Sequence, residues 1–120
     1  MRDHCPSSNQ ELLLAGKRVL VTGGGGFLGG HLARALARRG ADVHVLDTKL
    51  HGTAPAISGI EGDITDSESV ARAVDGCDLV FHYAALLGVE RTLGMWQEVM
   101  RVNRGGTVNV AQACARCGVK

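Results

Sequence analysis

The apolar residues of this chain gather in short runs that are typical of buried β-strands. Lys17–Thr22 is apolar at almost every position, as expected for a strand that is covered on both faces. Asp42–Asp47 and Asp78–Tyr83 are similar runs, and Ile57–Glu61 is a shorter one. The pattern therefore predicts strands at these four places along the chain.

Between the strands, the apolar positions follow helical spacing. From Phe27 to Arg39 apolar residues fall on one face, and Gly40 supplies a stop. A second helix should run to about Val74, because Asp66 or Ser67 can cap its first turn. Both segments are long enough to cross from one strand of a sheet to the next.

The last third of the chain predicts one long helix, from about Met95 to Arg116. Thr48–Ser58 and Ala84–Thr92 are expected to be loops, and Val119-Lys120 would begin a fifth strand. Strands that alternate with helices favour a parallel sheet with right-handed crossovers.

The predicted fold class is thus α/β, a Rossmann-type doubly wound parallel sheet that is truncated after about four strands. Residues 1–15 contain Pro6 and several small polar residues and are expected to form a flexible leader. Residues 16–120 are expected to form a single, incomplete domain.

Composition narrows the classes of function. With 13 Lys and Arg against 12 Asp and Glu, the net charge of +1 gives no electrostatic reason to expect binding to nucleic acid or to a membrane. No apolar run approaches the ~18 residues of a membrane helix, and no signal-peptide core is present. We therefore expect a cytoplasmic protein with reduced cysteines, and we interpret Cys114 and Cys117 as apolar packing rather than a metal site.

The glycines after the first strand carry the clearest chemistry. Gly23, Gly26 and Gly29 follow Thr22 with the spacing Gly-x-x-Gly-x-x-Gly. Such glycines allow a tight turn, a close approach of backbone to a pyrophosphate, and close packing of helix on strand. The N–H groups and dipole of the following helix then face the phosphates. A run of glycines could also be a flexible loop, but the flanking strand and helix favour a dinucleotide cradle.

Asp47 is an independent indication of the ligand. It ends the second strand, about 20 residues beyond the turn, where a carboxylate can accept hydrogen bonds from the ribose hydroxyls of adenosine. A carboxylate there repels a 2′-phosphate, so NAD is expected in preference to NADP, although Arg38, Arg39 and Lys49 could soften that preference. Taken alone, Asp47 would be interpreted as a solvated acid at a strand end.

Four segments in register extend this interpretation to a family. TGGGGFLGGHL, GDITD, FHYAA and VNRGGTVN occur in this order. Together they resemble the extended short-chain dehydrogenase/reductase family, also called the NAD-dependent epimerase/dehydratase family. The similarity covers roughly Lys17 to Lys120. It implies the cofactor-binding half of an NAD-dependent oxidoreductase.

The resemblance also implies roles for individual residues around the cofactor. Those expected to line the pyrophosphate are Gly23, Gly26, Phe27, Leu28 and Gly29. Those expected at the adenosine are Asp47 and Thr48 on the ribose, with Asp63 and Ile64 at the adenine. Those expected beneath the ribose and nicotinamide are Tyr83, Ala84, Ala85 and Leu86. Asn103 matches an asparagine that in the family belongs to the architecture of the cofactor site. Without the resemblance, Asn103 would be interpreted as a solvated helix residue and Asp63 as a turn or cap acid.

The catalytic groups of the family are expected beyond Lys120. The family uses a Ser or Thr and a Tyr-x-x-x-Lys pair for proton transfer. Tyr83 is the single tyrosine here and position 87 is Leu87, so Tyr83 does not match that pair. We therefore expect no turnover by this chain alone. His82, inside a strand, is expected to be a hydrogen-bonded core residue rather than a catalyst.

Three functions stay open from the sequence. The first is the NAD-binding part of an epimerase/dehydratase-type oxidoreductase whose small-molecule substrate is a sugar-nucleotide or a similar hydroxylated compound. The second is a hydroxysteroid dehydrogenase/isomerase-type member, and the third is a non-catalytic dinucleotide sensor or scaffold. Leu87–Trp96 would border the substrate. An open edge at the fourth strand is expected to favour pairing with another chain, as in a homodimer.

Overall fold

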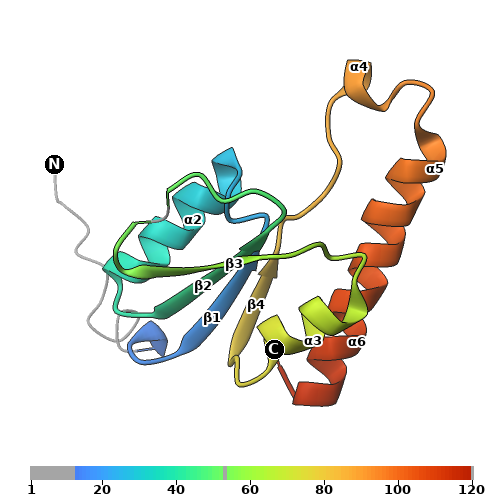
Figure 1. The fold of residues 1–120 in the computed structure, drawn as a ribbon. Helices are drawn as coiled ribbons and strands as arrows, with labels where there is room; N and C mark the ends of the chain where they lie inside the picture. Colours follow the sequence, from blue (N-terminus) through green and yellow to red (C-terminus); the bar gives the residue numbers. More distant parts are fainter. Residues whose placement is uncertain (1–12, 53, 120) are drawn as a thin grey trace, which may run out of the picture.

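The computed structural model describes residues 13–52 and 54–119, which form helices on both sides of a parallel sheet (Figure 1). Within these residues the sheet has four strands in the order β3-β2-β1-β4. The strands are β1 Arg18–Thr22, β2 Asp42–Asp47, β3 Ile57–Glu61 and β4 Leu79–His82. The predicted Rossmann-type fold is confirmed, and each predicted strand is present with small differences at its ends.

The helices lie on the two faces of this sheet. Helix α2 (Phe27–Arg38) packs on one face, and α3 (Ser67–Val74) and α6 (Thr107–Cys117) pack together on the other (Figure 1). From β1 the chain moves outward to β2 and β3, then returns to place β4 on the opposite side of β1. Ligands of open α/β sheets bind at such a switch point, beyond the carboxyl ends of the strands.

The side chains of β1 alternate between two cores. Val19 and Val21 are fully buried on the α2 side, where they pack with Ala33 and Leu36. Leu20 is equally buried on the other side, among residues of α3 and α6. Successive side chains of a strand point to opposite faces, and here both faces are covered by helices. That double coverage explains why the strand is apolar at almost every position.

The predicted long helix is present, but it is not uniform. It consists of α5 (Trp96–Val99), a π-helical stretch η1 (Met100–Gly106) and α6, which follow one another without a break. π-Helical winding is rare and frequently marks functional sites. Gly106 lies so close to Ile64 that a Cβ added there would overlap the isoleucine side chain. The sequence pattern predicts the extent of this helix but not its change in winding.

One smaller prediction is wrong. The expected loop Ala84–Thr92 contains a one-turn helix α4 (Val89–Thr92), which stands away from the sheet in Figure 1. Helix α6 ends at the left-handed Gly118, and the Val119 N–H donates to the Cys114 carbonyl at 2.9 Å. The start of a fifth strand at Val119-Lys120 stays a prediction, because Lys120 lies outside the described residues, as does the predicted leader up to residue 12.

Strand β4 forms one edge of the sheet within the described residues. It pairs with β1, and its four side chains are half-buried. The expected open edge at this strand is therefore present in the described part of the chain, while its association with another chain stays a prediction. None of the described helices has both the length and the apolar character needed to cross a membrane.

Candidate functional site

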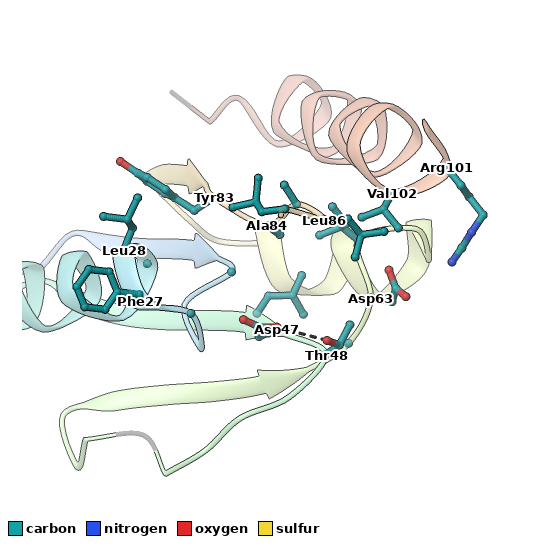
Figure 2. A pocket seen from close by; sticks show the side chains of 18 of the residues that line it. Phe27, Leu28, Asp47, Thr48, Asp63, Tyr83, Ala84, Leu86, Arg101 and Val102 are labelled. Atoms are coloured by element: carbon teal, nitrogen blue, oxygen red, sulfur yellow. Dashed lines mark hydrogen bonds between the residues drawn. The ribbon is translucent and has the colours of Figure 1, made fainter. Parts of the chain in front are cut away.

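A cavity of about 420 Å³ lies at the carboxyl ends of the strands, beside the switch point between β1 and β4 (Figure 2). Most of its lining consists of residues that the sequence predicts around a cofactor. These residues are Gly23, Gly26, Phe27, Leu28, Gly29, Asp47, Thr48, Asp63, Ile64, Tyr83, Ala84, Ala85 and Leu86. The fold thus brings four separate segments of the chain to one site. Their binding roles stay predictions.

The glycine turn forms the end of the cavity next to α2. Gly23 has a left-handed φ of +73°, and a Cβ there would lie 2.7 Å from the Ala84 nitrogen. A Cβ on Gly29 would overlap the Gly23 carbonyl, so this glycine allows α2 to start against the turn. No side chain caps α2. Its first-turn N–H groups therefore lack intrahelical partners at the place where Phe27 and Leu28 line the cavity.

Asp47 and Thr48 lie where β2 ends. The Asp47 Oδ2 accepts a hydrogen bond from the Gly25 N–H at 3.0 Å, which fixes the carboxylate beside the glycine turn. The Thr48 hydroxyl donates to Asp47 Oδ1 at 3.4 Å. Both side chains line the cavity (Figure 2), so the carboxylate that the sequence assigns to a ribose faces the same space as the glycine turn.

Asp63 and Ile64 follow β3 on the same side of the cavity. Asp63 Oδ1 accepts the Thr65 N–H at 2.9 Å, so the residue does make the turn contact that its alternative interpretation expects. It also lines the cavity, and these two roles are compatible because a carboxylate has several acceptor positions. Ile64 is 4% exposed and belongs to the core beneath α6. It supplies an apolar surface that does not move easily.

The segment Tyr83–Leu86, called the floor below, runs along the cavity from the end of β4. Thr22 holds one end, because its Oγ1 accepts the N–H groups of Tyr83 at 3.1 Å and Ala84 at 3.2 Å. Asn103 holds the other end: its Oδ1 accepts the Leu86 N–H at 2.7 Å, and its Nδ2 donates to the Leu86 carbonyl at 3.1 Å. Asn103 is not among the lining residues and acts through the floor.

Comparison with known proteins identifies the family. The model of the NAD dependent epimerase/dehydratase family matches residues 19–120. The chain belongs to this family. It is 42% identical over 109 residues to a 3 beta-hydroxysteroid dehydrogenase/Delta 5-->4-isomerase of Mycobacterium tuberculosis, an alignment that covers 86% of the chain and 30% of the relative.

Solved structures of family members have the same fold. An epimerase of Methanothermobacter thermautotrophicus superposes with a TM-score of 0.85 at 31% identity, covering 92% of this chain and 35% of that one. The UDP-glucose 4-epimerase of Thermus thermophilus, solved in complex with NAD, gives a TM-score of 0.77 at 33% identity and covers 86% and 35%. The chain therefore spans about a third of the length of the family members that it matches.

Six lining residues were given no cofactor role from the sequence: Leu46, Gly62, Leu87, Glu98, Arg101 and Val102. The last three belong to α5 and η1 and form one wall of the cavity. The Arg101 guanidinium bonds the Glu98 carboxylate at 2.9 and 2.5 Å, and these hydrogen bonds lower the pKa of Glu98. Their spacing of three residues on a helix was visible in the sequence. It did not show that this side of the helix faces the cavity.

The cysteines that the structure describes, Cys77, Cys114 and Cys117, give no sign of a metal or redox centre. Cys77 is buried and Cys114 is half-buried in the core beside α3 and α6, and burial raises the pKa of both thiols. Apolar packing thus accounts for Cys114, but for Cys117 that interpretation is wrong because its side chain is exposed. Within residues 13–52 and 54–119 no three His, Cys, Asp or Glu side chains are grouped to hold a metal ion.

Proposed function

We propose that this chain is the NAD-binding part of an oxidoreductase of epimerase/dehydratase type. One observation carries the proposal: the residues predicted for the phosphates, the ribose, the adenine and the nicotinamide side line a single cavity. Figure 2 shows Phe27 and Leu28 near the glycine turn, Asp47 and Thr48 below, and Asp63 toward the opposite end. An extended two-ended ligand fits such an arrangement.

The residues present fit a dinucleotide. At Gly23 and Gly29 a Cβ would meet backbone, so these glycines let the turn close tightly against Ala84 and the start of α2 beside the cavity, as a pyrophosphate cradle requires. The uncapped start of α2 offers N–H groups and the positive end of the helix dipole to the phosphates. Asp47 offers acceptors for ribose hydroxyls. The bound nicotinamide would accept or donate a hydride during the reaction.

The charges of the site support NAD over NADP. Asp47, Asp63 and Glu98 line the cavity, and among its described lining residues Arg101 is the single Lys or Arg. Arg101 is already engaged by Glu98. A 2′-phosphate would add negative charge beside Asp47, with no unengaged arginine or lysine in the lining to receive it.

The substrate class rests on relatives and on the surface next to the cavity. A sugar-nucleotide is the first candidate, because UDP-glucose 4-epimerase shares the fold and 33% of the aligned residues. A hydroxysteroid is the second candidate. It is favoured by the 42% identity to the mycobacterial dehydrogenase/isomerase and by the apolar segment Leu87–Trp96, where Leu87, Val89, Leu93 and Trp96 are 68–78% exposed. Such a surface suits an apolar substrate or a covering segment of protein.

Catalysis by these 120 residues alone is not part of the proposal. Tyr83 is the single tyrosine, and no lysine stands four positions later. We infer that the acid/base groups and the substrate-binding portion belong to sequence that follows Lys120 in the parent protein. If that sequence lacks Tyr-x-x-x-Lys, the sensor or scaffold function is favoured instead.

Calorimetric titration of the chain with NAD and with NADP tests the proposal. NAD should bind, and NADP should bind more weakly. Asp47→Asn should weaken NAD binding by about tenfold, because a charge-assisted hydrogen bond contributes about 1.5–3 kcal/mol. It should also reduce the difference in affinity between NAD and NADP. Asp75→Asn, an exposed acid outside the cavity lining, serves as the matched control. Equal affinity for NAD and NADP, or no effect of Asp47→Asn, would contradict the assignment.

A further inference from the structure

His82 connects β1 to α6 through a series of hydrogen bonds, called the hydrogen-bond chain below. Its Nδ1 lies 2.6 Å from the Oγ1 of Thr22 on β1, and its Nε2 lies 2.8 Å from the Oγ1 of Thr107 at the start of α6. The Thr107 hydroxyl lies 2.5 Å from the Asn103 carbonyl. Thr22 is fully buried, and His82 is half-buried. The expected core histidine is therefore bonded at both ring nitrogens.

The donors and acceptors of this hydrogen-bond chain allow one arrangement of the protons. Thr22 Oγ1 accepts the Ala84 N–H and shares the Tyr83 N–H with the Thr22 carbonyl, so its own proton is left to donate to His82 Nδ1. A carbonyl only accepts, so the Thr107 hydroxyl donates to Asn103 and accepts from His82 Nε2. The imidazole is therefore neutral, with its proton on Nε2.

The hydrogen-bond chain begins and ends at residues that bind the floor of the cavity. At one end Thr22 receives the amides of Tyr83 and Ala84, and at the other Asn103 binds both backbone groups of Leu86. His82 is the link that ties β1 to α6 between these two anchors. A shift of the imidazole would therefore move two supports of the floor at once.

We propose that neutral His82 is a positioning residue, which holds the floor in the conformation that receives the nicotinamide half of the cofactor. The inference rests on the proposed NAD-binding function. His82 acts through Thr22 and Thr107 rather than by touching the cofactor, since it is not among the residues that line the cavity. It also makes cofactor binding sensitive to acid.

Protonation of His82 would break the hydrogen-bond chain at Nδ1. A second N–H at Nδ1 would face a Thr22 oxygen that already accepts the Ala84 N–H and part of the Tyr83 N–H. Burial lowers the pKa of His82 below its usual 6.5. The groups that bond the ring nitrogens from β1 and α6 are hydroxyls, which carry no charge to support the imidazolium. Cofactor affinity should therefore be full near neutral pH and fall in acid.

The test measures NAD affinity and the melting temperature of the 120-residue chain between about pH 8 and pH 5. The unmodified chain should lose affinity several-fold in acid. His82→Gln should bind several-fold more weakly at pH 8 and show no acid loss, because the titrating group is gone. Thr107→Val should weaken binding, and Thr107→Ser, which keeps the hydroxyl, should restore most of it. His51→Gln, an exposed histidine outside this cavity, should behave as the unmodified chain does.

The outcomes separate the two proposals. If the unmodified chain does not bind NAD at pH 8, the proposed function fails and the role of His82 fails with it. If it binds NAD but His82→Gln changes the melting temperature alone, His82 is structural and the inference is overturned while the function stands. An ¹⁵N NMR spectrum that places the His82 proton on Nδ1 at neutral pH would also overturn it.

Discussion

Two neighbouring glycines of α2 should respond to alanine in opposite directions. Gly29 and Gly30 are both buried within the helix, where alanine is favoured over glycine by about 1 kcal/mol. Propensity alone thus predicts that either substitution stabilises the chain. The structure distinguishes the two sites by what a new Cβ would contact.

At Gly30 the nearest atoms to an added Cβ are the Gly24 carbonyl oxygen at 3.4 Å and a side-chain nitrogen of Arg34 at 3.5 Å, which are ordinary contacts. Gly30→Ala should therefore keep most of the gain of about 1 kcal/mol. At Gly29 the Cβ would overlap the Gly23 carbonyl, which belongs to backbone and has little room to move. Overpacking of this kind costs about 1–3 kcal/mol, which equals or exceeds the helical gain.

Thermal unfolding followed by circular dichroism measures both variants. A change of 1 kcal/mol shifts the melting temperature of a domain of this size by roughly 4–8 °C. Gly30→Ala should melt higher than the unmodified chain, whereas Gly29→Ala should melt lower and bind NAD more weakly, because its turn must open. If both variants shift in the same direction, the reasoning from Cβ contacts is refuted.

Three further outcomes follow from the structure. Arg101→Ala should weaken NAD binding by about threefold, most at low salt, because Glu98 would remain as an unpaired carboxylate on the wall of the cavity. Titration calorimetry at two salt concentrations checks this. Asp66→Ala should lower the urea midpoint of unfolding by removing the cap of α3. Hydrogen bonds from Ser69 and Glu68 lower the pKa of Asp66, so its contribution is present above its ordinary value of 3.8 and is lost as pH falls below it. The chain alone should transfer no hydride with a sugar-nucleotide and NAD, and absorbance of NADH checks this.

The parts of the fold that sequence predicts are those set by local pattern. Lys17–Thr22 is apolar throughout because both faces of β1 are covered, and that property is visible without knowing which helix covers which face. The glycine turn is visible in the same way, since Gly29 packs on Gly23 six residues earlier, although Gly23 also packs on the distant Ala84. Asp47 was expected near the turn because it ends the second strand about 20 residues later, and its carboxylate does bond the Gly25 N–H, while its role on a ribose stays a prediction.

What sequence does not predict depends on distant contacts. Glu98 and Arg101 line the cavity from α5 and η1, and nothing in the helical pattern of Met95–Arg116 marks the change to π-helical winding at Met100. From the sequence, His82 was expected to make hydrogen bonds, but their partners could not be named. Their partners, Thr22 and Thr107, lie 60 and 25 residues away along the chain. The tautomer of the ring follows from those partners and has no sequence signature.

The helical segment η1–α6 emerges as the common support of both ends of the site. Asn103 binds the backbone of Leu86 on the floor, and Asn109 donates to the Ile64 carbonyl at 2.8 Å on the opposite side. Between them Gly106 packs directly on the Ile64 side chain. Because one helical segment makes both contacts, it sets the distance from the floor to Ile64. Under the proposed function a dinucleotide would bridge these two sides, and this segment would then set the length of ligand that the site accepts.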